Sequence, residues 1–321
     1  MKKNLTKKLM LSVLTLAFAV VSLGASTFAW FTVSKEAEVE TFKMDVTADA
    51  GIQIAVSAVD GSAKSDYYIN TLPATEITKV FTAKQFTKFL DLTSYKAGTA
   101  AVGNEGDEGY VPAVAAKAEF EGTLYDKTGV AKVEKDGYVA LRFYITADAA
   151  GTITVTVPWL AQTATSTKVA WAAGSEFMRG AETIAAADKY LYDVLSAARM
   201  SVCYDGTYTT YQEVESAKGA VNGEFGNTLG YAAEDQGSLA IYNSFYANDA
   251  LAQLDAPTEA DTATGIAKDG SHVFTIDAAR NTEYFFDLYI WVEGFDAECV
   301  NAIFAQQIQA SVSFDFAQTN A

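Results

Sequence analysis

The sequence predicts an all-β protein: a jelly-roll-like antiparallel β-sandwich with short helical connections, preceded by an N-terminal hydrophobic helix that acts as a signal or an anchor. Two observations favour this fold class. Apolar and polar residues alternate with a period of two in many short segments, which is typical of strands with one face in a core and the other in water. Strands do not alternate with long helical segments, which disfavours a parallel α/β sheet.

Composition limits the classes of protein that need to be considered. The chain has 321 residues, of which 50% are hydrophobic, so it can bury a sizeable core. Its 23 basic residues include four lysines that precede the apolar N-terminal segment, which leaves 19 basic against 40 acidic residues, a net charge of −21, in the remainder. Such a surface repels nucleic acid, so no nucleic-acid partner is expected.

The N-terminus has the layout of a secretory signal. A basic stretch, "MKKNLTKK", is followed by the uncharged apolar segment Leu9–Ala25. Small residues allow a signal peptidase to cut after Ser26 or after Ala29, directly before Trp30. Apolar character nevertheless continues to Val33, which is long enough to span a bilayer of ~30 Å.

Two alternatives therefore remain for residues 1–29: a removable signal peptide or a permanent membrane anchor. The lysines before the apolar segment and the acids after it place the N-terminus in the cytoplasm in both cases. Residues 30–321 then form an extracellular β-sandwich domain, and the protein is secreted or held at the cell surface.

The stretch "GASTFAWFT" (24–32), followed by a predicted strand, resembles the N-termini of TasA/camelysin-type exported proteins of Gram-positive bacteria. Their signal peptides are cut by the SipW class of signal peptidase near an aromatic-rich T-x-A-x-F stretch, which Thr27, Ala29 and Phe31 match. The resemblance is confined to this segment. It implies an exported protein of the cell surface or biofilm matrix that assembles into fibres.

The first predicted strand follows this segment almost without a linker. In "TFKMDVTA", Phe42, Met44 and Val46 alternate with charged and polar residues. We expect the segment from about Glu38 to Val46 to be both the first strand of the domain and an assembly strand. It can pair within its own domain or exchange into a neighbouring copy, so self-assembly is the expected partnership.

Later segments continue the alternation to the C-terminus. The repeated sequences "VTADAGIQIAV" (46–56) and "ITADAAGTITV" (145–155) predict two similar hairpins, because Asp and Gly suit a turn. The predicted core positions include Ile52, Ile54, Val56, Val139, Leu141, Phe143, Ile145, Ile153, Val155, Val157 and Ile290.

Helical patterns are short and are predicted to be connections across the sandwich. They cover residues 82–92, 175–193, 242–254 and 296–307. The only two cysteines, Cys203 and Cys299, exclude a disulfide-dense scaffold. They form either one bridge, which would close a long loop, or two separate thiols.

No catalytic, cofactor-binding or metal-binding residues are predicted, and we expect the protein not to be an enzyme. Catalytic triads and zinc sites need a histidine with partners, and the single histidine, His272, lies in a segment predicted to be a Gly-rich loop. The metalloprotease activity described for camelysin-type relatives is not supported, because H-E-x-x-H is absent. Asn104–Gly109 concentrates oxygen ligands suited to calcium, but it lacks EF-hand spacing, and a solvated acidic loop is the alternative.

Two classes of function remain: a structural surface or matrix protein, and a carbohydrate-binding or carbohydrate-processing surface domain. The second is suggested by Asp287 and Glu293 on an aromatic strand, for which the alternative is an exposed strand face with ordinary acids. Aromatic rings that line an exposed groove beside two carboxylates would favour sugar. The same residues buried, with a detachable first strand, would favour assembly. The aromatic residues in question include Trp159, Trp171 and Trp291.

Overall fold

A computed structural model gives the structure of the protein. It describes residues 43–59, 61, 63–80, 92–94, 96, 101–103, 105–106, 110–112, 120–126, 131–132, 138–162, 169–172, 177–179, 182–184, 189–192, 194–213, 263–293 and 308–319. The predicted signal segment, its cleavage region and Phe42 lie outside these residues. None of the helices in the described ranges is long and apolar enough to cross a membrane.

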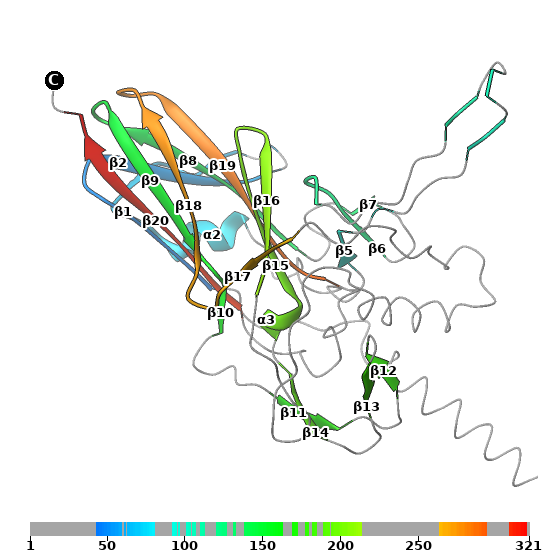
Figure 1. Ribbon diagram of the computed structural model, residues 1–321. Helices are drawn as coiled ribbons and strands as arrows, with labels where there is room; N and C mark the ends of the chain where they lie inside the picture. The colour runs from blue at the N-terminus through cyan, green and yellow to red at the C-terminus, as the bar shows by residue number, and fades with distance from the viewer. Residues whose placement is uncertain are drawn as a thin grey trace, which may run out of the picture.

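Two large sheets pack face to face, which confirms an all-β sandwich (Figure 1). Sheet A has the order β18 (Ser271–Ala278), β9 (Gly151–Pro158), β20 (Ile308–Gln318), β1 (Lys43–Ala48) and β4 (Thr71–Leu72), with β10 (Ala161–Gln162) also paired to β20. Sheet B has the order β17 (Thr264–Ile266), β16 (Thr207–Glu213), β15 (Ala198–Tyr204), β19 (Glu283–Val292), β8 (Val139–Ala147), β2 (Ile52–Ala58) and β3 (Tyr68–Ile69).

Among the described residues, the structure also contains shorter strands and two short helices. The predicted helix at 175–193 is wrong, because three strands occupy parts of this segment. Helix propensity is a weak preference, and here strand pairing overrides it. The other three predicted helical segments lie almost wholly outside the described residues. The smaller elements are β5 (Leu92–Thr93), β6 (Leu124–Asp126), β7 (Ala131–Lys132), β11 (Val169–Ala172), β12 (Phe177–Arg179), β13 (Glu182–Ile184), β14 (Lys189–Tyr192), α2 (Ala74–Val80) and α3 (Val194–Ala197).

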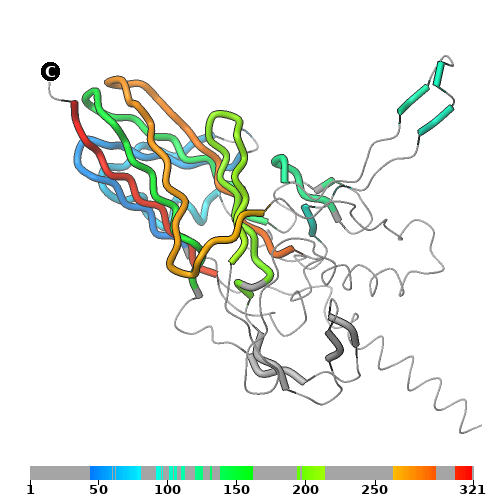
Figure 2. The backbone as a smooth tube through the Cα atoms, viewed as in Figure 1, coloured from blue at the N-terminus to red at the C-terminus, as the bar shows by residue number. Residues whose placement is uncertain are grey.

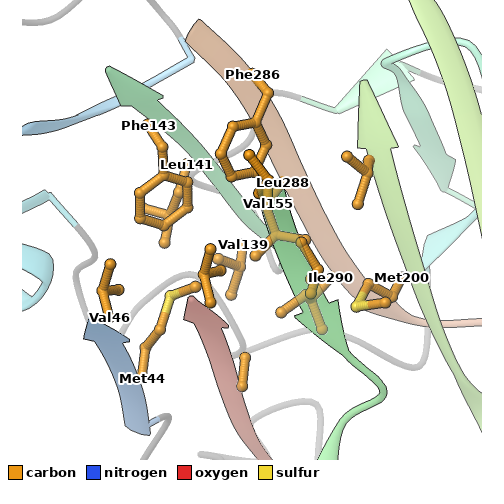
Figure 3. Packing of buried hydrophobic residues seen from close by; sticks show 14 of the residues in the cluster. Met44, Val46, Val139, Leu141, Phe143, Val155, Met200, Phe286, Leu288 and Ile290 are labelled. Carbon is orange, nitrogen blue, oxygen red and sulfur yellow. The ribbon is translucent and has the colours of Figure 1, made fainter. Parts of the chain in front are cut away.

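The main core fills the space between the two sheets, and the period-two pattern predicts it well. Met44 and Val46 of β1 meet side chains from β8, β9 and β19 there (Figure 3). Phe143 and Ile290, both predicted to be core, are completely buried. The ring of Phe143 stacks on that of Phe286 with centroids 5.2 Å apart.

The two segments predicted to be hairpins are instead corners between the sheets, so this prediction is wrong. The chain passes from β1 in sheet A to β2 in sheet B, and from β8 in sheet B to β9 in sheet A. The corners meet, because the Asp148 N–H donates to the carbonyl oxygen of Gly51 at 3.0 Å. Asp and Gly allow a tight change of direction, but they do not determine which sheet receives the next strand.

Glycine is required where the second corner packs. A Cβ at Gly151 would lie 2.4 Å from the carbonyl oxygen of Ala317 and 2.7 Å from the ring of Phe316. The same ring lies 3.3 Å from the Cβ position of Gly51, which has a φ of 92°. The end of β20 therefore packs against both corners.

The prediction of purely antiparallel pairing is also corrected. β1 runs parallel to β20, and β17 runs parallel to β16, whereas the other described strand pairs of the two large sheets are antiparallel. Figure 2 shows β1 (blue) and β20 (red) side by side, although they lie near opposite ends of the chain.

Replacing Phe143 or Ile290 by Ala should lower the free energy of unfolding by about 2–5 kcal/mol, because each change leaves a cavity in a core with no access to water. Urea unfolding followed by circular dichroism measures this loss. Phe285→Ala is the matched control on the same sheet, since Phe285 is 50% exposed, and it should cost less than about 1 kcal/mol. Equal losses in all three variants would show that the two faces of sheet B are misassigned.

Candidate functional site

The first candidate site is β1 together with the strands that hold it. All six residues of β1 pair in parallel with β20, from Lys43 opposite Gln309 to Ala48 opposite Phe314. On the other side, β4 pairs only with Val46 and Thr47. The strand is therefore fixed mainly by one long partner that comes from the far end of the sequence.

Side chains of β1 alternate as the sequence predicts. Met44 and Val46 are buried, whereas Asp45 and Thr47 are exposed. The Asp45 carboxylate accepts a hydrogen bond from the Nε2 amide of Gln309 at 3.1 Å. β1 thus contributes two core side chains and main-chain pairing. Phe42, the third residue of the predicted assembly set, lies outside the described residues.

Two hydrogen bonds tie the corner after β1 to β20, and a third joins the end of β1 to the residue between β3 and β4. The Asp49 N–H donates to the carbonyl oxygen of Phe314 at 2.9 Å, and the Asp49 carboxylate accepts from the Phe316 N–H at 3.2 Å. The Ala48 N–H donates to the carbonyl oxygen of Asn70 at 2.7 Å. These bonds hold β1 in place up to the corner at which the chain crosses to sheet B.

The second candidate site consists of two carboxylates, Asp287 in β19 and Glu293 just after it, and it does not lie on an exposed face. Asp287 is buried and forms a bidentate ion pair with Arg142 of the neighbouring strand. Its Oδ1 accepts from Nε at 2.7 Å and its Oδ2 accepts from Nη2 at 2.8 Å. The Asp287 carboxylate raises the pKa of the Arg142 guanidinium. This carboxylate is therefore occupied by a structural partner.

Glu293, just after β19, is completely buried and hydrogen-bonded. Its Oε2 accepts from the N–H of Ser94 at 2.9 Å, from the Ser94 hydroxyl at 3.0 Å and from the indole N–H of Trp291 at 3.2 Å. Ser94 directly follows β5, so Glu293 ties the small sheet β5–β6–β7 to the outer face of sheet B.

Aromatic side chains between these carboxylates form a second core. The ring of Phe120 stacks on Trp291 with centroids 4.5 Å apart and meets Tyr289 edge-on at 4.9 Å. Burial raises the pKa of the Tyr289 hydroxyl. Trp159 and Trp291 are both buried, while the side chain of Trp171 is not described. These rings are packed within the protein and do not line a groove.

His272 lies in a strand, so its prediction as a loop residue is wrong. It is the second residue of β18, and its Nδ1 lies 2.6 Å from the hydroxyl oxygen of Tyr211 in β16. This contact joins β18 of sheet A to β16 of sheet B. Burial lowers the pKa of the imidazole. "SHVFTI" alternates like a strand, which is the signal that the preceding Gly-rich stretch obscured.

The remaining predicted sites fall partly outside the described residues. Cys203 is half-buried, and burial raises the pKa of its thiol. Cys299 lies outside the described residues, so the pairing of the two cysteines stays a prediction. Most of the acidic segment Asn104–Gly109 also lies outside it. Within the described ranges, no group of three or more His, Cys, Asp or Glu side chains is placed to hold a metal ion.

A scan against protein-family models, a search of curated proteins and a search of solved structures each found no match to this chain.

Arg142→Met should lower the free energy of unfolding by about 3 kcal/mol at neutral pH, because it leaves the buried Asp287 carboxylate without its charged partner. Arg142→Lys, which keeps the charge but loses the planar fork, should fall between the wild type and the Met variant. Chemical denaturation measures both losses. A loss for Arg142→Met within the ~0–1 kcal/mol of exposed pairs would contradict the structural role.

Acidification should destabilise the fold through His272. Its folded pKa is lowered below the ordinary value of about 6.5, so the unfolded chain binds more protons below neutral pH and stability falls as the pH drops through that value. His272→Gln removes this titration. Comparing unfolding free energies at pH 7 and pH 5 should show a smaller loss in the variant than in the wild type, and an identical loss would refute the assignment.

Proposed function

We propose that this protein is an exported structural protein of the cell surface or extracellular matrix, and that its copies assemble into fibres by exchanging β1. Residues 1–29 direct export and are then removed by signal peptidase, or they remain as a hydrophobic anchor helix in the membrane. The sandwich that follows is of jelly-roll type. Its role is structural and requires no catalytic residue.

The observation that carries this proposal is the position of β1 in sheet A. It lies at the start of the domain, contributes Met44 and Val46 to the core, and has the last strand, β20, as its main partner. A copy whose own β1 is displaced would expose a strand-shaped gap beside β20. The β1 of a neighbour can fill that gap with the same main-chain bonds and the same two side chains.

The connection to β2 suits such an exchange. Only Asp49–Gly51 separate the two strands, and Gly51 has a positive φ that other residues rarely adopt. Short hinges under strain favour exchange between copies, because opening the hinge relieves the tight turn. The β1–β20 pairs that a copy loses when its own β1 is displaced are formed again with the β1 of its neighbour.

Burial of the aromatic residues supports assembly over carbohydrate recognition. Trp159 and Trp291 contribute to cores, Asp287 is ion-paired with Arg142, and Glu293 is enclosed beneath Ser94. No described feature favours a sugar site. The jelly-roll assignment is supported by the chain's repeated passage between sheets, from β1 to β2, from β8 to β9 and from β18 through β19 to β20.

A cysteine pair across β1 and β20 tests the exchange directly. Asp45 and Ser311 are register partners on the outer face of sheet A, and paired strands lie about 4.8 Å apart, which is within disulfide range. If β1 exchanges, oxidised Asp45→Cys/Ser311→Cys protein should form a ladder of covalent oligomers on non-reducing gels. Negative-stain microscopy of the same material should show fibres.

The single variants Asp45→Cys and Ser311→Cys are the controls, and neither should form this ladder. Cross-linked protein that runs only as a monomer would show that each copy keeps its own β1. The proposed exchange would then be wrong, although export would be unaffected.

A further inference from the structure

β18 is the longest free edge among the strands that the structure describes. It has eight residues and pairs with β9 on one side only. The other edges of the two large sheets are formed by β4 and β3 with two residues each and by β17 with three. Natural edge strands are usually blunted by shortness, Lys, Pro or bulges. β18 contains neither Lys nor Pro, and Asp277 is its only acidic residue.

Hydrogen-bond alternation identifies the groups that point away from β9. The Trp159 N–H donates to the carbonyl oxygen of Gly270 at 2.9 Å, so these two residues form a hydrogen-bonded pair in the antiparallel register. Alternation then directs the main-chain groups of every second residue from Ser271 toward the free edge. Pro158 fits this alternation. It lies opposite Ser271 in a non-hydrogen-bonded pair, where β9 donates no N–H to β18. The outward residues are Ser271, Val273, Thr275 and Asp277.

The side chains of these four residues are exposed on the outer face of sheet A. Val273 is 55% exposed, which makes it one of the most exposed large apolar residues that the structure describes. On the inner side, Phe274 is half-buried, and its ring stacks on Tyr204 with centroids 4.8 Å apart. The edge thus combines unpaired main-chain groups with apolar surface on both faces.

The four outward residues are complementary to themselves. An antiparallel pairing about a two-fold axis at Phe274 places Ser271 opposite Asp277 of the second copy, and Val273 opposite Thr275. The Ser271 hydroxyl can donate to the Asp277 carboxylate, and Val with Thr is a favourable β-branched pair. The two Asp277 carboxylates lie ~20 Å apart along the strand direction, which limits their repulsion.

We infer that β18 is a homotypic docking edge, at which two copies of this chain join their A sheets through antiparallel β18–β18 pairing. Each outward residue then exchanges two N–H···O bonds with its partner. The edge lies at the opposite side of sheet A from β1, separated from it by β9 and β20. It therefore provides contacts in addition to β1 exchange and does not depend on that exchange.

Mixed cysteine variants test the register. Val273→Cys and Thr275→Cys proteins, prepared separately from the full chain and then mixed under mild oxidation, should form a heterodimeric disulfide, because the paired Cα atoms lie about 5.5 Å apart. Each variant alone should not cross-link at this edge, because like positions in the two copies are offset by two residues and lie beyond ~7 Å. Val273→Cys mixed with Gln53→Cys, an exposed position on sheet B, is the matched control. Wild-type protein corrects for Cys203 and Cys299.

Oligomeric state provides the second test. Val273→Lys should raise the dimer Kd about tenfold or more, measured by analytical ultracentrifugation, while circular dichroism confirms an unchanged fold. Val273→Thr should retain the dimer. A monomeric wild type, an undiminished dimer in Val273→Lys, or no cross-link specific to the mixture would overturn the inference. The Asp45→Cys/Ser311→Cys ladder should persist when Val273→Lys is added, because β1 exchange does not use the β18 edge. Loss of the ladder on adding Val273→Lys would show that the two contacts are not independent.

Discussion

The parallel pairing of β1 with β20 is the constraint on which the rest of the fold depends. These strands lie near the two ends of the chain, yet they form the centre of sheet A with β9. Loop-closure entropy must be overcome before such a contact can stabilise anything, so we expect it to form late. Until β20 has been synthesised, β1 lacks its main partner. A growing chain therefore passes through a state in which β1 has not yet paired with β20.

The packing of β20 explains why the two corners have similar sequences. Phe316 lies against Gly51 and Gly151, and Asp49 binds the main chain of β20. Each "TADA" segment passes from one sheet to the other at the same end of the sandwich, and the Asp148 N–H bonds the Gly51 carbonyl. The two segments thus have similar sequences because both corners must turn sharply beside the ring of Phe316.

The sequence predicts the two inner faces because a strand with one wet face has a period of two. This rule correctly identifies Ile153, Val155 and Val157. It fails for β19, where Asp287 and Trp291 are buried along with Leu288, because a second layer covers the outer face. The nearly continuous apolar run "YFFDLYIWV" was the available signal for burial on both sides. The Arg142 partner could not be predicted, since register depends on how the sheets assemble.

Sheet B is buried on both faces around β19, and this makes its strands harder to exchange than those of sheet A. Sheet B holds β19 between two cores and ties its carboxylates to Arg142 and Ser94, so exchanging its strands would break buried ionic contacts. Among the described residues, only the inner face of sheet A is buried, and the side chains of its outer face are small and mostly polar, as in Thr154 and Ser313. Separating or adding a strand there disturbs main-chain bonds and a few core side chains without stranding a charge. For a chain this acidic, association through strands that carry few charges also limits electrostatic repulsion, which salt further screens. Sheet A is therefore the part of the molecule that can exchange or extend strands at the lowest cost in free energy.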